Sequence, residues 1–158
     1  MRALPANHSP TPRWTRHLVP LLLAWLLATV WGSVVQTQWN LQALVDVGVA
    51  IPLVERARAT WQDLIGFAPV YGGILAAGWL PALAAAGWLA RRWPTWRSAL
   101  LACAAGAGMV AAVRAVDVAA PMPVFIDATR HLPGLLVMAA GAVMAGLLYA
   151  QLTTPHRP

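Results

Sequence analysis

Five ionisable side chains gather in one short stretch of the chain, on either side of a proline-containing loop. They are Arg114, Asp117, Asp127, Arg130 and His131. Two carboxylates at one site can act as a general acid and a general base. Asp127 and His131 are four residues apart, so they can share a helix face and supply half of a metal site. The spacing of Arg114 and Asp117 is that of a local ion pair, and the sequence favours a rim of paired charges over a catalytic site.

A second group of polar side chains follows the first apolar run. Gln36, Gln38, Asn40 and Gln42 recur at every second position of the segment QTQWNLQALVDVGVAI. Amides donate and accept hydrogen bonds at once, as the recognition of sugar, lipid-headgroup or quinone oxygens requires. The simpler interpretation is a helix end with solvated side chains, and the sequence favours it over a binding segment.

Other patterns of catalytic and cofactor-binding proteins are missing from the sequence. It contains no HExxH metal motif, Walker loop, nucleophile elbow or GxGxxG in a strand context. The single Cys103 excludes a disulfide or a CxxC pair within one chain. His17 and His131 begin spans on opposite sides of the membrane, so they cannot share a haem iron. We therefore expect no metal and no cofactor.

Composition places these residues in a membrane protein. Hydrophobic residues make up 59% of the chain and charged residues only 10%, and the mean hydropathy is +0.62. The net charge of +6 would suggest nucleic-acid binding in a soluble protein. Here the arginines stand singly or in pairs at the ends of apolar runs, which is typical of membrane topology signals, so we expect no nucleic-acid partner.

Four apolar runs have the length needed to cross the hydrocarbon of a bilayer. They cover approximately residues 18–35, 68–90, 98–118 and 132–152. The predicted fold is an all-α, four-transmembrane-helix bundle in a single integral membrane domain, residues 1–158. The short turn RRWPTWR makes the second and third spans an antiparallel hairpin. A cleaved signal peptide is the alternative for the first run, but no A-x-A cleavage site follows it.

The segment VERARATWQDLIGF, between the first two spans, has the pattern of an amphipathic helix. On a helical projection its apolar residues fall within an arc of roughly 120°, and its charged residues lie outside that arc. Pro52 suits the first turn of a helix and Gly66 its end. We expect a helix over approximately residues 52–66 that lies on the outer membrane surface or packs on the outer ends of the spans.

The distribution of arginine predicts the orientation. Seven arginines fall on one side of the predicted spans: Arg2, Arg13, Arg16, Arg91, Arg92, Arg97 and Arg157. Four fall on the other: Arg56, Arg58, Arg114 and Arg130. The positive-inside rule therefore predicts that both termini are cytoplasmic. The use of Arg without any Lys fits a GC-rich bacterial genome, so we expect a multi-pass protein of a bacterial inner membrane.

In size, in its four expected spans and in two aspartates at the outer surface, the chain resembles lipoprotein signal peptidase. In that family, two aspartates act as an acid/base pair at the outer membrane surface, and the resemblance would give these roles to Asp117 and Asp127. The Asn-Asp motifs that surround the aspartates of that family are absent from VRAVDVAAP and VFIDATRHL. An intramembrane enzyme acting on lipid or lipoprotein is accordingly the third functional hypothesis.

The leading hypothesis is a non-enzymatic accessory or scaffold subunit, or a homo-oligomer, assembled by helix packing. Its expected partners are the lipid bilayer and another membrane protein or a second copy. Small residues four apart, such as Ala102 and Gly106 or Ala142 and Gly146, let helices approach closely, and they predict contact between the third and fourth spans. A small transporter or channel is the alternative, although no ionisable side chain lies in the middle of a span to serve a proton relay.

The predicted orientation has a direct test. A reporter protein that is active only in the cytoplasm should work when fused to the C-terminus and fail when inserted near Gly48, because the arginine count places these sites on opposite sides of the membrane. Reporter activity in intact cells is the measurement. The reverse result at either site would show that the orientation is wrong.

Overall fold

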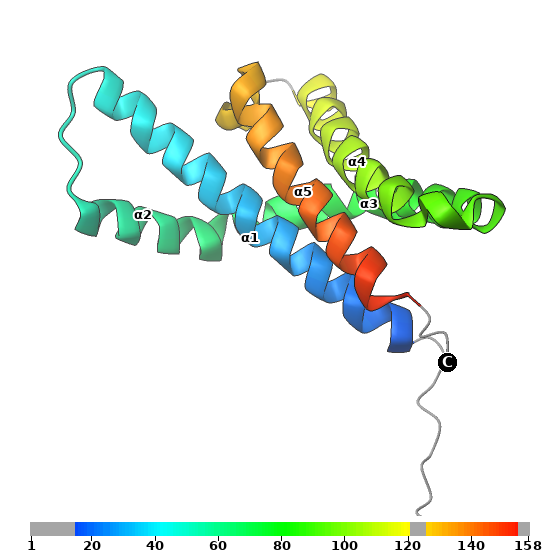
Figure 1. Ribbon diagram of the computed structural model, residues 1–158. Coiled ribbons are helices and arrows are strands. Elements are labelled where there is room, and N and C mark those ends of the chain that lie inside the picture. The colour runs from blue at the N-terminus through cyan, green and yellow to red at the C-terminus, as the bar shows by residue number, and fades with distance from the viewer. Residues whose placement is uncertain (1–14, 121–125, 155–158) are drawn as a thin grey trace, which may run out of the picture.

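The computed structural model describes residues 15–120 and 126–154, and this part of the chain is built from helices (Figure 1). Five α-helices and two short 3-10 turns follow one another: α1 Thr15–Asp46, α2 Leu53–Gly66, α3 Ala68–Arg92, η1 Pro94–Trp96, α4 Arg97–Ala119, η2 Asp127–Thr129 and α5 Leu132–Leu152. The expectation of an all-α chain is confirmed for the described residues.

Four of these helices are long and apolar enough to cross a membrane. They are α1, α3, α4 with its preceding turn, and α5, and their most apolar windows have mean hydropathies between 1.5 and 2.1. At a rise of about 1.5 Å per residue, even the 21 residues of α5 cover the hydrocarbon thickness of about 30 Å. The chain is a helical multi-pass membrane protein.

The four long helices pack as a ring. The helix α1 lies against α3 and α5, and α4 also lies against α3 and α5. The first residues of α1 and the last residues of α5 lie at the same end of the molecule (Figure 1). We call this end, where Arg91, Arg92 and Arg97 also lie, the arginine end. The opposite end, where Gln36 meets the turn η2, is the polar end.

Two close approaches between helices depend on glycine. A Cβ atom added at Gly78 of α3 would overlap the carbonyl oxygen of Gly108 in α4. A Cβ atom at Gly146 of α5 would lie 2.7 Å from the Cβ atom of Ala105 in α4. Small residues allow such backbone contact, which is a main source of helix association in lipid. The small-residue pairs predicted contact between the third and fourth spans, and the corresponding helices α4 and α5 do pack against each other.

At each of the four contacts between neighbouring helices of the ring, a side chain of one helix donates a hydrogen bond to a backbone carbonyl oxygen of the other. Three donors are indoles: Trp25 Nε1 donates to Gly72 (2.9 Å), Trp31 Nε1 to Val137 (2.9 Å) and Trp79 Nε1 to Ala105 (2.8 Å). The fourth is Arg97, whose Nη1 donates to Ala150 at 2.8 Å. Trp79 is buried and Trp25 is half-buried, so their indole N–H groups need a partner within the protein; together with the exposed Trp31, they join the helices in pairs.

The helix α1 continues beyond the expected end of the first span at Val35 and ends at Asp46. The chain then reverses at Gly48, whose φ of 93° suits glycine far better than other residues. The helix α2 returns beside the last part of α1 (Figure 1), and a single residue, Phe67, separates it from α3. The part of α1 after Val35 thus forms a helical hairpin with α2 at the polar end.

The contact of Gly78 with Gly108 gives a matched test of the packing. Gly78→Ala should lower the free energy of unfolding by about 2 kcal/mol or more, because the new methyl group meets a backbone oxygen that cannot move aside. Gly87→Ala, on the same helix, should have little effect or be slightly stabilising, since nothing lies within 4 Å of its Cβ position. Unfolding in lipid bicelles measures both, and equal effects would contradict this packing.

Candidate functional site

The amide side chains predicted as a binding segment lie on the last part of α1, where each of them has a hydrogen-bond partner within the described chain. Gln36 is buried, and its Oε1 accepts a hydrogen bond of 2.8 Å from the backbone N–H of Ala128. Its Nε2 points to Oδ1 of Asn40 at 3.5 Å. The Gln36 side chain therefore holds the turn η2 against α1, although 92 residues separate the two partners in sequence.

Gln38 and Gln42 hold the helix α2. The Nε2 of Gln38 donates to Oγ1 of Thr60 at 2.9 Å, and its Oε1 accepts from Nη1 of Arg56 at 3.2 Å. The Oε1 of Gln42 accepts from Nη2 of Arg56 at 3.4 Å, and its Nε2 donates to Asp46 at 2.9 Å. We call Gln36, Gln38 and Gln42 the amide clamp, because they join α1 to η2 and α2.

A hydroxyl group completes the attachment of α2. Thr37 Oγ1 lies 2.7 Å from Oδ2 of Asp63 and 2.9 Å from the carbonyl oxygen of Ser33. Three polar residues of α2, namely Arg56, Thr60 and Asp63, thus face α1. The apolar side chains of α2 face away: Leu53 is 81% exposed and Trp61 is 65% exposed. The helix packs by Arg56, Thr60 and Asp63, and it leaves uncovered both its apolar side and a second polar side, which carries Glu55, Arg58 and Gln62.

The five charged residues predicted as a cluster form two local pairs. Nη1 of Arg114 lies 3.4 Å from Oδ2 of Asp117 on α4, and Nε of Arg130 lies 2.7 Å from Oδ1 of Asp127 in η2. Both pairs join residues three apart, and both arginine side chains are more than half exposed. His131 is exposed and directly precedes α5. Exposed pairs of this kind contribute only about 0 to 1 kcal/mol to folding.

This arrangement does not assemble a metal centre in the described part of the chain. No group of three His, Cys, Asp or Glu side chains there is close enough to hold a metal ion. Asp127, the carboxylate expected to pair with His131, is bound by Arg130. The interaction that the four paired charged residues make is ion pairing at the surface.

Two buried hydroxyl groups stand apart from these contacts. Thr29 and Ser33 lie on the inward face of α1, and neither Oγ1 of Thr29 nor Oγ of Ser33 has a hydrogen-bond partner. They continue the line of Thr37 at four-residue spacing towards the middle of the span. Hydroxyl groups without a neighbouring base or carboxylate are weak nucleophiles, so this line has no evident catalytic use.

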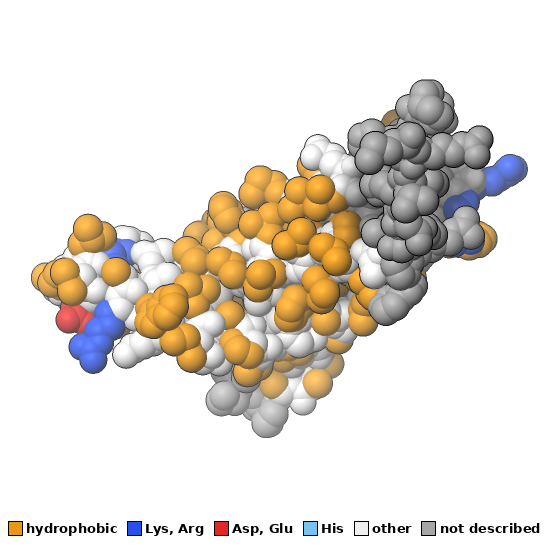
Figure 2. Space-filling view, turned by 90° about the horizontal axis from the view of Figure 1, so that it is seen from below, with side chains coloured by type: hydrophobic (Ala, Val, Ile, Leu, Met, Phe, Trp, Pro, Cys, Tyr) orange, Lys and Arg blue, Asp and Glu red, His pale blue; other side chains and the backbone are white. Residues whose placement is uncertain are grey.

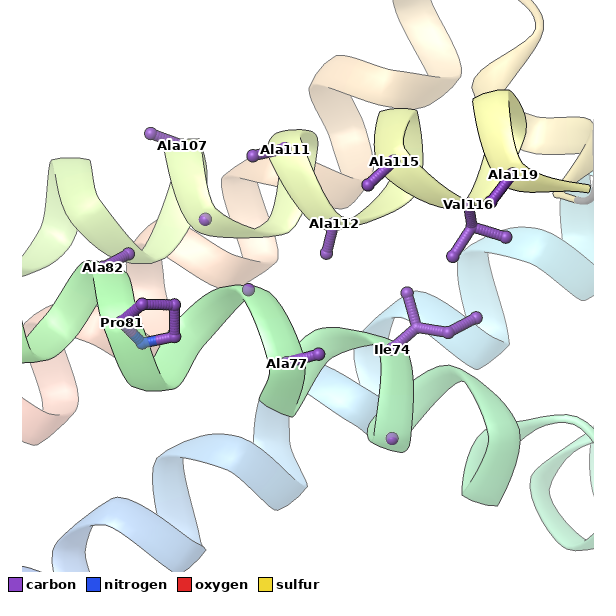
Figure 3. Close-up of a pocket in the computed structure, with 13 residues that line it drawn as sticks. Ile74, Ala77, Pro81, Ala82, Ala107, Ala111, Ala112, Ala115, Val116 and Ala119 are labelled. Atoms are coloured by element: carbon purple, nitrogen blue, oxygen red, sulfur yellow. The ribbon is translucent and has the colours of Figure 1, made fainter.

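A large apolar groove lies between α3 and α4, and sequence reasoning missed it (Figure 3). It has a volume of about 870 Å³ and runs between Gly73 and Ala82 on α3 and between Ala107 and Ala119 on α4. All thirteen lining residues are Gly, Ala, Val, Ile or Pro. Figure 3 shows Ile74 and Val116 pointing towards each other across it. The α3–α4 groove offers no polar chemistry and can bind only an apolar body.

The exposed face of α4 differs from that of α1. On α4, small residues recur at every fourth position and all are exposed: Ala99, Cys103, Ala107, Ala111, Ala115 and Ala119. We call this series the α4 ladder. On α1 the exposed positions are bulky: Leu18, Val19, Leu22, Leu23, Leu26 and Leu27. Figure 2 shows one face of the molecule, with hydrophobic side chains over its central part and the visible charged side chains towards its ends.

Comparison with known proteins adds no identification. No family model, no curated protein and no solved structure matches the chain. The function therefore has to be inferred from the surfaces of the molecule itself.

The amide clamp gives a testable prediction. Gln36→Leu should lower the free energy of unfolding by about 1 to 3 kcal/mol, because it leaves the buried N–H of Ala128 without an acceptor. Gln42→Leu, at an exposed position of the same helix, should change it by no more than about 0.5 kcal/mol. Unfolding in bicelles, with limited proteolysis of the loop before α5, measures both. A mild effect of Gln36→Leu would show that the loop is held by other contacts.

Proposed function

We propose that the protein is a non-enzymatic subunit of a membrane assembly, either an accessory or scaffold subunit of another membrane protein or a homo-oligomer. It joins its partner by helix packing, and the α4 ladder is the observation that carries the proposal. From Ala99 to Ala119 the ladder extends over about 30 Å, the hydrocarbon thickness of a bilayer. Because the ladder winds around α4, a straight partner helix meets a part of it.

The physical reason lies in the lipid environment. Apolar side chains gain little from leaving lipid for another apolar surface, so helices associate mainly where small residues allow close backbone contact. Inside the ring, Gly78, Gly108 and Gly146 make such contacts. The α4 ladder also consists of small residues, five alanines and Cys103, at four-residue spacing, but it is exposed. A helix of another chain is the partner that this surface fits.

The polar residues support a non-enzymatic role. The amide clamp is occupied in joining α1 to α2 and η2, and the carboxylates of Asp117 and Asp127 each pair with an arginine three residues away. An acid/base pair of carboxylates can act only when both carboxylates reach the same reacting bond of the substrate. The helix-packing surface, by contrast, is free of competing contacts within the described chain.

We place the protein in a bacterial inner membrane with both termini in the cytoplasm, so that the polar end faces outwards. The excess of arginine at the arginine end and on the two tails supports this orientation. In it, α2 is an amphipathic helix on the outer membrane surface. Only Phe67 separates α2 from the span α3, so the last turns of α2 lie within about 10 Å of the hydrocarbon. Its exposed apolar side chains then face lipid.

The position of α2 can be tested through Trp61. In a variant with Trp61→Cys and Cys103→Ala, which keeps Trp25, Trp31 and Trp79, a fluorophore attached at position 61 should be quenched strongly by lipids that carry a quencher near the headgroup, because this position is exposed. Aqueous iodide should quench it weakly. Strong quenching by iodide alone would place α2 in water, away from the bilayer.

The α4 ladder can be tested by photo-cross-linking in native membranes. A small photoreactive side chain at position 103, in place of Cys103, should give one discrete adduct, because this exposed ladder residue lies in the proposed contact and outside the α3–α4 groove. The same probe at Leu26, exposed near the middle of the spanning part of α1, is the matched control and should label lipid. The adduct mass separates a second copy from another protein. Equal labelling at the two positions would contradict the proposal.

A further inference from the structure

The α3–α4 groove extends over half of the membrane. Its wall on α4 runs from Ala107, beside the middle residue of that helix, to Ala119 at the polar end. These twelve steps correspond to about 18 Å, close to the thickness of one leaflet of the hydrocarbon. A transmembrane helix needs about twice that length, whereas the hydrocarbon chain of a lipid in one leaflet matches it.

The shape of the groove also favours a hydrocarbon chain. At Gly78 and Gly108 the backbones of α3 and α4 are in contact, which closes the floor of the groove near the middle of the membrane. An α-helix with its side chains is about 10 to 12 Å wide, so it would bridge such a floor without filling it. A single acyl chain is flexible and narrow, and the exclusively apolar lining offers nothing that a polar ligand could bind.

A cationic side chain stands at the edge of the groove near the polar end. Arg114 does not itself line the groove, but it directly precedes the lining residue Ala115 and follows the lining residue Ala111 by three positions, so its side chain leaves α4 about 60° from that of Ala111. Arg114 precedes the end of α4 by five residues, or about 7 Å, and a long arginine side chain can reach the headgroup level from there. Its side chain is 53% exposed, and its described contact is a single one of 3.4 Å to Asp117.

We propose that the α3–α4 groove binds one acyl chain of a glycerophospholipid from the leaflet at the polar end, and that Arg114 binds the phosphate of the same lipid. The guanidinium has five N–H donors, and its contact with Asp117 engages one of its nitrogens, so donors remain for phosphate oxygens. The charge complementarity and the leaflet length together select a phospholipid. This site is additional to the helix partner of the α4 ladder.

Two glycines of α3 provide the test. Nothing lies within 4 Å of the Cβ position of Gly73, which lines the groove, or of Gly87, which does not. The variants Gly73→Leu and Gly87→Leu add the same side chain to the same helix, inside and outside the site. Both leave the α4 ladder unchanged, and position 103 of the ladder does not line the groove, so the cross-link from that position reports on the proposed function independently of the lipid.

The full-length protein is extracted from nanodiscs of phosphatidylglycerol and phosphatidylcholine in equal amounts, and retained lipid is counted by native mass spectrometry. The wild type and Gly87→Leu should each retain one phospholipid, and Gly73→Leu should lose most of it. Ala77→Leu, at an exposed position of the same wall, repeats the test if Gly73→Leu does not fold. Equal retention by the two glycine variants, whether high or low, would overturn the site in the groove.

The role of Arg114 is measured in the same experiment. Arg114→Gln should lower the retention of phosphatidylglycerol about fivefold, which corresponds to the loss of one basic group near an anionic lipid. Arg58→Gln, which removes an exposed arginine of α2, is the control and should retain lipid like the wild type. If Arg114→Gln and Arg58→Gln behave alike, Arg114 does not bind the phosphate.

Discussion

The contact between Gly78 and Gly108 is the constraint on which the arrangement of α3 and α4 depends. Neither position can carry a side chain, because a Cβ atom on either would press on the backbone of the other helix. This proximity also brings the indole of Trp79 within 2.8 Å of the carbonyl oxygen of Ala105. Two backbones in contact leave a hollow on their flank that small side chains do not fill, and the α3–α4 groove is that hollow.

At the polar end, hydrogen bonds take the place of glycine contacts. Polar side chains in the last part of α1 form hydrogen bonds within the chain. Gln36 binds η2, and Gln38 and Thr37 bind α2. In water, an amphipathic helix normally buries its apolar side and exposes its polar side. On α2 the apolar side is uncovered as well as Glu55 and Arg58, so an apolar surface beside this helix would remove Leu53 and Trp61 from water.

The sequence predicted features that depend on local spacing or on hydrophobicity. Hydropathy identified four helices able to span a membrane, and the spacing of Arg114 and Asp117 predicted their ion pair. Small-residue pairs predicted the contact of α4 with α5. The four-residue spacing of the α4 ladder is also visible in the sequence. Which side of a helix stays exposed, however, is decided by the packing of its neighbours.

Contacts between distant parts of the chain were not predictable in this way. Trp25, Trp31 and Trp79 donate to backbone carbonyl oxygens, and since every residue has one, no residue type marks the acceptor. The bond from Ala128 to Gln36 joins residues 92 apart, and the amide pattern alone fits a solvated helix end equally well. The groove likewise requires two helices to cross at one particular pair of glycines.

The two proposed partners can occupy α4 together because of the way the ladder winds. Four residues turn an α-helix through about 400°, so each step of the ladder advances its direction by about 40°. Over the five steps from Ala99 to Ala119 the ladder therefore turns through about 200°, and a straight partner helix can follow only a part of it. Towards the polar end the ladder faces α3, where Ala115 and Ala119 line the groove. A partner helix centred near Cys103 and Ala107 leaves that end to a lipid chain.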